Sequence, residues 1–185
     1  MMPEISLNIL DVAQNSVTAG ATLVTIAVTA DTAEDLLRVS ISDNGRGMTA
    51  EQVARVTDPF VTTRTTRKVG LGIPFFKMAA ELAEGEFSIE SEPGVGTVTR
   101  ASFRIGHIDR MPLGDLAGTM SSLVGPSPDI DFVLELERDG AAFTADTRQF
   151  REILGPDVPL SEPEVLDYLE NYVRDGMKEI GMDGL

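Results

Sequence analysis

Apolar residues recur at helical spacing at the start of the chain and then alternate with polar residues. The inward positions of the first segment, residues 4–19, are Ile5, Ile9, Val12, Ala13, Ser16 and Val17, and Gly20 follows as a stop signal. Residues 22–28 and 36–42 are rich in β-branched side chains, and a short polar segment joins them. The pattern predicts an opening helix followed by two paired antiparallel strands.

Helices and antiparallel strands continue to about residue 105. Thr49 and Gln52 have capping-box spacing, and Pro74 falls in the first turn of a helix that Gly85 closes. The expected elements are helices at residues 49–56 and 71–84 and strands at residues 87–91 and 97–105, with a turn at residues 92–96. This order predicts an α+β fold, a two-layer α/β sandwich with helices on one face of a sheet.

The glycine-rich signatures stop after residue 105, and a second set of elements begins. An apolar helical stripe covers residues 113–124, and Asp139-Gly140 marks a hairpin between residues 132–137 and 141–146. A last helix is expected from the capping-box sequence at residues 161–164. We therefore expect a domain at residues 1–105 and a small α+β C-terminal module at residues 106–185.

The bulk composition narrows the class of protein. Of the 185 residues, 42% are hydrophobic and 24% are charged, which is ordinary for a globular protein and disfavours disorder. The absence of cysteine excludes disulfides and thiolate metal sites, and no signal peptide or membrane-spanning run is visible, so we expect a cytoplasmic protein. The net charge of -15 disfavours binding to nucleic acid or membrane and points to a protein partner.

Polar side chains gather in the first half of the chain. Asn8, Asp11 and Asn15 stand three and four positions apart, so they share one face of the opening helix. Taken alone, they describe a solvated helix face. Directly after a strand, Asp43 opens a stretch that contains Gly45 and Gly47. Such glycines allow a flat ligand to approach the backbone, and a carboxylate there could accept a hydrogen bond from an amine such as that of adenine.

A third stretch combines glycine with positive charge. Gly70 and Gly72 enter a predicted helix, whose unpaired N–H groups attract phosphate. Three cations lie just before it: Arg64, Arg67 and Lys68. A fourth stretch, residues 94–97, opens a strand with Thr97, whose hydroxyl could hydrogen-bond Asp43 or the base. Each stretch alone would also fit an ordinary surface loop or hairpin turn.

Together and in this order, the four stretches resemble the motifs of GHKL ATPases, and most closely those of the ATP-binding domain of sensor histidine kinases. Residues 7–16 are similar to the N box, residues 43–48 to the first glycine box, residues 58–72 to the Phe box with the second glycine box, and residues 94–97 to the third glycine box. The resemblance covers residues 4–105 and implies the Bergerat ATP-binding fold.

The resemblance also implies a role for each matching residue. Asn15 would coordinate Mg²⁺ at the ATP phosphates, Ala19 would flank the base, and Asp43 would bind the adenine amino group. Gly45, Gly47 and Met48 would form the pocket wall, and Thr97 would support Asp43. The ATP lid would include Phe60, Thr62, Thr63, Arg64, Arg67 and Lys68, and the phosphates would lie against Gly70, Leu71 and Gly72.

Three departures from the family pattern bear on activity. Asp11 stands where hydrolysing members carry a glutamate base and many histidine kinases an asparagine, so we take it as the candidate catalytic residue. Its side chain is one methylene shorter than that of glutamate. Thr18 replaces the Lys or Asp that is usual three positions after the asparagine, and the lid is short.

Three functions fit this resemblance. The first is an ATP-dependent protein kinase acting on a separate protein through residues 106–185, because no phosphoacceptor hairpin precedes the N box and His107 is better explained as a surface histidine. A stand-alone Ser/Thr kinase of the anti-sigma type is built in this way. The second is an ATP-hydrolysing switch resembling mismatch-repair relatives, and the third is a nucleotide sensor. The lid sequence favours the first, and a homodimer is compatible with all three.

Overall fold

The computed structural model describes residues 3–58 and 71–185, which form a mixed α+β fold with a single sheet. Its strands are β1 (Leu23–Asp31), β2 (Leu36–Asp43), β3 (Phe87–Glu92), β4 (Gly96–Arg104), β5 (Asp131–Arg138) and β6 (Ala141–Asp146). Its helices are α1 (Ile5–Thr18), α2 (Ala50–Thr57), α3 (Gly72–Leu82), α4 (Leu116–Val124), α5 (Thr147–Leu154) and α6 (Pro163–Glu179). The predicted α+β class is confirmed.

The six strands stand in the order β3-β4-β2-β1-β5-β6. All neighbouring pairs are antiparallel except β1 and β5, which run parallel. In β1, buried residues alternate regularly with partly exposed ones, as expected of a strand with one face against the core. The chain returns to β1 from β4 through α4, because a parallel neighbour needs a crossover connection.

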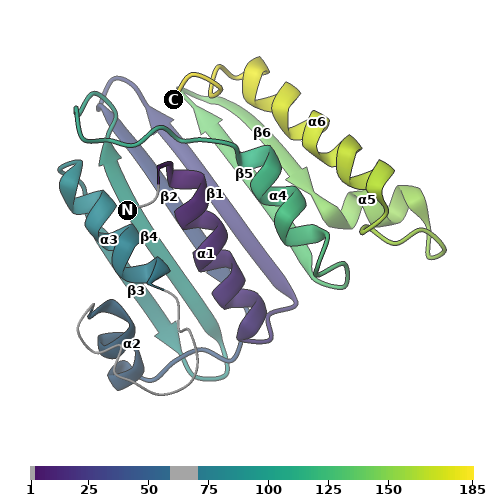
Figure 1. The fold of residues 1–185 in the computed structure, drawn as a ribbon, viewed down its shortest axis with the longest axis horizontal. Coiled ribbons are helices and arrows are strands. Elements are labelled where there is room, and N and C mark those ends of the chain that lie inside the picture. The colour runs from purple at the N-terminus through teal and green to yellow at the C-terminus, as the bar shows by residue number, and fades with distance from the viewer. Residues whose placement is uncertain (1–2, 59–70) are drawn as a thin grey trace.

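The four longest helices, α1, α3, α4 and α6, lie on one face of the sheet (Figure 1). Their apolar stripes and the inner face of the sheet form one continuous hydrophobic core, which extends from Ile5 to Met182. In α1, Ile5 and Ile9 are fully buried, as the helical spacing of the sequence predicts. This packing fixes α1 over β1 and β2 and so positions the polar face of the helix.

The sheet runs across the boundary expected near residue 106. Strand β5 pairs with β1 over eight residues, so the C-terminal hairpin extends the sheet begun by the N-terminal half. The segment before α4 also caps the N-terminus of α1. The N–H groups of Ile5 and Ser6 donate to the carbonyl oxygens of Pro112 and Leu113 at 3.0 and 2.8 Å. Residues 106–185 are thus joined to the first half by backbone hydrogen bonds and by the core.

One capping prediction and one turn prediction are confirmed, and a second capping prediction is wrong. Thr49 and Gln52 make both hydrogen bonds of the capping box at the start of α2. Asp139 and Gly140 both have positive φ, of 50° and 88°, as a two-residue hairpin turn requires. At α6, however, the cap residue is Glu162 and no side chain caps the helix. Proline at the first position removes one of the N–H groups that a cap would have satisfied.

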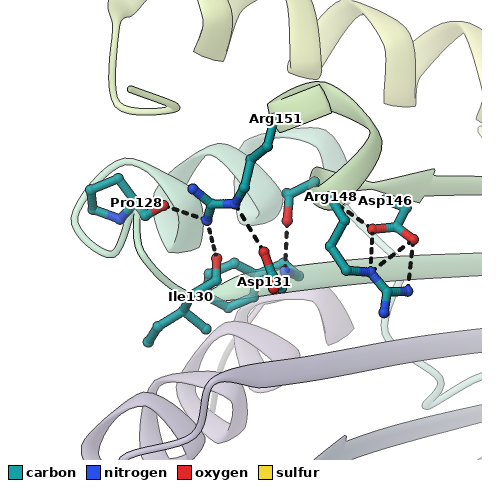
Figure 2. Close-up of polar contacts among 8 residues, drawn as sticks. Pro128, Ile130, Asp131, Asp146, Arg148 and Arg151 are labelled. Carbon is teal, nitrogen blue, oxygen red and sulfur yellow. Dashed lines mark hydrogen bonds and ion pairs between the residues drawn. The ribbon is translucent and has the colours of Figure 1, made fainter. Parts of the chain in front are cut away.

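Helix α5 was not expected from the sequence, and polar contacts hold it in place (Figure 2). The Arg151 guanidinium donates to the Asp131 carboxylate at 2.9 Å and to the backbone carbonyls of Pro128 and Ile130. Asp146 caps the helix and binds Arg148, and the Thr147 hydroxyl accepts from the N–H of Phe132 at 2.9 Å. Helix α5 is therefore anchored to the start of β5.

Candidate functional site

The three polar residues of α1 occupy environments of decreasing burial. Asn8 is 1% exposed and lies within the core, Asp11 is half-buried and Asn15 is exposed. Among the described residues, the side chains of Asp11 and Asn15 make no hydrogen bond, so both are available to a ligand. Only the later part of the predicted polar face is therefore open to a bound molecule.

Asp11 lies against the beginning of α3. A Cβ atom built on Gly72 would stand 2.8 Å from the Asp11 Cβ, so only glycine permits this close approach of α1 and α3. Burial raises the pKa of the Asp11 carboxyl above its ordinary value, because desolvation disfavours the charged form. The structure thus places the candidate base directly beside the helix start at which the sequence predicts phosphate binding.

The Asp43 side chain is held by two hydrogen bonds at the end of β2. The Ser16 hydroxyl on α1 donates to Oδ2 at 2.6 Å, and the Gly45 N–H donates to Oδ1 at 2.8 Å. Ser16 is only 3% exposed, so this contact is shielded from water. The carboxylate consequently has a fixed orientation, and its remaining lone pairs can accept from a ligand.

Glycines shape the loop that follows Asp43. A Cβ on Gly45 would stand 2.9 Å from the Ala19 Cβ, and the Arg46 N–H donates to the Ala19 carbonyl oxygen at 3.0 Å. Gly47 has a φ of +68°, and a Cβ there would overlap the carbonyl oxygen of Glu92. Ala19, Asp43 and Gly45 are therefore brought together at one point, as the family resemblance implies.

Thr97 does not make the expected hydrogen bond to Asp43. It stands opposite Asp43 in the β2–β4 ladder, but its hydroxyl lies 2.8 Å from the Ser91 hydroxyl on β3. Ser91 also accepts from the Met48 N–H at 2.8 Å. Thr97 and Met48 are thus linked through Ser91, while Ser16 takes the supporting role predicted for Thr97.

Several predicted site residues lie outside the described residues. They are Phe60, Thr62, Thr63, Arg64, Arg67, Lys68 and Gly70. Leu71, which immediately precedes α3, is described and is 44% exposed. The predictions for the lid stay predictions, and the described site consists of α1, the loop after β2, the start of α3 and the turn between β3 and β4.

Two supporting residues escaped the sequence analysis. Ser16 was placed among the inward positions of α1, and nothing in a single sequence shows that its hydroxyl reaches a carboxylate 27 positions away. Asn44 accepts at Oδ1 from the N–H groups of Thr22 and Leu23, at 2.8 and 3.0 Å. Its position directly after Asp43, at a strand end, was the available signal.

Residues 3–107 match the model of the histidine kinase-, DNA gyrase B- and HSP90-like ATPases. This stretch covers more than half of the chain. The chain belongs to this family of ATP-binding GHKL domains.

Curated relatives match over parts of the chain. The non-motile and phage-resistance protein of Caulobacter vibrioides is 32% identical over 97 residues, which cover 50% of this chain and 12% of that protein. Sporulation kinase E of Bacillus subtilis is 40% identical over 65 residues, which cover 35% of this chain and 9% of the kinase. The chain therefore corresponds to a small portion of each of these relatives.

Solved structures show the same fold. The Aquifex aeolicus MutL ATPase domain complexed with ADP aligns with a TM-score of 0.51 and 14% identity, covering 83% of this chain and 70% of that one. The N-terminal domain of a DNA repair protein aligns with a TM-score of 0.51 and 11% identity, covering 77% and 52%. At 11–14% identity the similarity shows a shared fold only. This fold is the predicted Bergerat ATP-binding fold.

No described helix has the length and apolar character needed to cross a membrane. No group of three His, Cys, Asp or Glu side chains within residues 3–58 and 71–185 is arranged to hold a metal ion.

We expect Ser16→Ala to lower the free energy of unfolding by about 1–3 kcal/mol, because a shielded carboxylate loses a hydrogen-bond donor. Urea denaturation followed by circular dichroism measures this change. Ser88→Ala is the matched control, since Ser88 is an exposed serine on β3 whose hydroxyl makes no hydrogen bond among the described residues. Equal stability of the two variants would contradict the assigned contact.

We expect Asp11→Asn to stabilise the protein at pH 7. Because the folded state holds the Asp11 proton more tightly than the unfolded chain, the Asp11 contribution to stability is present below the unfolded pKa and lost as pH rises through the folded pKa. Denaturation at pH 7 and at decreasing pH toward the ordinary carboxyl pKa of 3.8 should show a gain that shrinks as the pH falls. Asp175→Asn on α6 controls for the removed charge, and a destabilised Asp11→Asn at pH 7 would contradict the prediction.

Proposed function

We propose that the site binds ATP with the adenine amino group donating to Asp43. The fixed orientation of this carboxylate, set by Ser16 and Gly45, supports the proposal. Gly45 adds no side chain beside the carboxylate and brings the loop backbone close to Ala19, so these residues present a compact surface there. A planar base with one exocyclic donor is the ligand that suits such a surface.

The phosphates would lie between α1 and the start of α3. The N-terminus of α3 carries the partial positive charge of the helix dipole, and Gly72 adds no side chain there. Asn15 is exposed on α1 and offers an amide oxygen. Mg²⁺ commonly takes one or two protein oxygens and completes its shell with phosphates and water, so Asn15 fits a shared magnesium ion, whose charge would neutralise the phosphates.

For Asp11 we propose the role of general base in phosphoryl transfer to a separate protein. The carboxylate accepts the proton of a Ser or Thr hydroxyl, whose oxygen bonds to the γ-phosphorus while the bond to the β-γ bridging oxygen breaks and ADP leaves. Burial raises the pKa of the Asp11 carboxyl, which makes the carboxylate a stronger base. Sporulation kinase E, a relative by sequence, is a kinase by name.

The same residues could serve hydrolysis. In that alternative Asp11 activates water, and the chain is an ATP-driven switch, as the fold shared with a MutL ATPase domain would allow. A sensor that binds nucleotide without chemistry is the third possibility. The proximity of Asp11 to Gly72 favours a catalytic function, since a sensor needs no partly desolvated carboxylate beside the phosphates.

We expect Asp43→Asn to weaken ATP binding by about 1–3 kcal/mol, because the adenine amine loses its acceptor. Isothermal titration calorimetry with ATP and with inosine triphosphate, which has a carbonyl in place of the amine, sharpens the test. The wild type should prefer ATP, and Asp43→Asn should lose or invert that preference, because its amide can donate to the carbonyl.

Asp175→Asn is the matched control for this measurement, because Asp175 is an exposed carboxylate on α6. It should keep the wild-type preference for ATP. An Asp43→Asn variant that folds normally and still prefers ATP to the same extent would reject the proposed contact.

Incubation with Mg²⁺ and γ-labelled ATP, with and without cell extract, tests the reaction. The kinase proposal predicts label on a separate protein and a loss of about 10²–10⁴-fold in Asp11→Asn, with Asp175→Asn unaffected. If free phosphate is released, no protein is labelled and Asp11→Asn abolishes the release, the kinase proposal is rejected in favour of an ATP-hydrolysing switch. If the chain binds ATP but yields neither labelled protein nor free phosphate, the nucleotide-sensor function is supported.

A further inference from the structure

A groove of about 840 Å³ lies between α5 and α6, at the β6 edge of the sheet. Helix α5 supplies Phe150 and Ile153, the connecting loop supplies Val158, and α6 supplies Tyr168 and Tyr172. The proposed nucleotide site consists of α1, the loop after β2, the start of α3 and the turn between β3 and β4, so the two sites are separate (Figure 1). This groove plays no part in the function proposed above.

The floor of the groove is aromatic and unusually exposed. Phe150 contacts both tyrosines edge-on, with ring centroids 5.8 and 5.7 Å apart, and Tyr168 and Tyr172 are stacked at 6.3 Å. Tyr168 is 61% exposed and Ile153 is 85% exposed. Rings that hold one another in place present apolar area at little cost in side-chain entropy, as binding surfaces do.

The rim of the groove is acidic. Residues 147–172 contain six acidic and two basic residues, and Glu162 and Glu164 line the groove itself. Both basic residues are engaged elsewhere, Arg148 by Asp146 and Arg151 by Asp131 (Figure 2). Among the described residues neither Glu162 nor Glu164 takes part in an ion pair. The carboxylates therefore face any occupant without a basic neighbour to neutralise them.

The acidic rim and the aromatic floor together indicate which kind of molecule fits the groove. A second copy of the chain would bring acidic rims together, and an anionic membrane surface would be repelled by the same carboxylates. An extended segment would need free backbone groups along a strand, whereas side chains of two helices and their loop line this groove. Apolar side chains flanked by Lys or Arg on a helix satisfy both the aromatic floor and the acidic rim.

We propose that the groove between α5 and α6 docks a basic amphipathic helix of a partner protein. The inference rests on the proposed function only in making that partner the phosphorylated protein. Binding of the helix itself needs no nucleotide, so it can be measured in the absence of ATP. A failure of helix docking would not affect the proposed binding of adenine by Asp43. A failure of adenine binding would likewise not affect helix docking.

The chain provides its own reporter for the groove. It contains no Trp and two Tyr, and both tyrosines line this surface. A model peptide of about 18 residues, with Leu on one face and Lys on the other, is long enough to form a helix when bound. Titration into the full chain should change the tyrosine emission and saturate at one peptide per chain, while the same peptide with Glu in place of Lys should have no effect.

Substitutions locate the binding. Ile153→Asp and Glu164→Lys should each weaken binding of the Leu–Lys peptide by about tenfold or more, because they remove an apolar anchor and a rim charge. Ile108→Asp is the matched control, since Ile108 is 94% exposed and does not line the groove. It should bind the peptide as the wild type does.

The proposal is overturned if Ile153→Asp binds like Ile108→Asp, or if the Leu–Glu peptide binds as tightly as the Leu–Lys peptide. Sedimentation of the free protein adds a further check. A dimer that Ile153→Asp dissociates would assign the groove to a second copy of the chain and reject the basic helix.

Discussion

The hydrogen bond from Ser16 to Asp43 joins α1 to the end of β2, and the rest of the site is arranged around this junction. The buried face of α1 places Ser16, and the β2 ladder places Asp43, so the contact forms only when helix and sheet pack in register. The second donor to the Asp43 carboxylate is the Gly45 N–H, which belongs to the loop that approaches Ala19. A carboxylate held in this way is preorganised, and ligand binding does not have to order it.

Hydrogen bonds connect the C-terminal part of the chain with this junction. Asn44, next to Asp43, holds the N–H groups of Thr22 and Leu23, and the Thr22 carbonyl accepts from the N–H of Asp131. The Asp131 carboxylate in turn binds Arg151 on α5, which borders the groove. A continuous set of hydrogen bonds therefore connects the loop after β2 with the helix that lines the acidic groove.

Local pattern was enough to predict most elements of the fold. The period of the apolar residues placed α1 and the β1–β2 pair, and the Asp139-Gly140 turn placed the second hairpin. Helix α5 was missed because polar anchors at Arg151 and Thr147 hold it, and few of its side chains are buried. The parallel pairing of β1 with β5 was also beyond a local pattern, since it depends on which sheet edge the α4 crossover reaches.

Motif order predicted that Ala19, Asp43 and Gly45 belong to one site, but it assigned the hydroxyl that supports Asp43 to Thr97 instead of Ser16, because tertiary packing decides which hydroxyl reaches the carboxylate. The most direct test of the account is a crystal structure of the chain with Mg²⁺ and a non-hydrolysable ATP analogue. The account predicts the adenine amine at hydrogen-bonding distance from Asp43 and the phosphates between Asn15 and the start of α3. A nucleotide bound elsewhere, or a base turned away from Asp43, would contradict it.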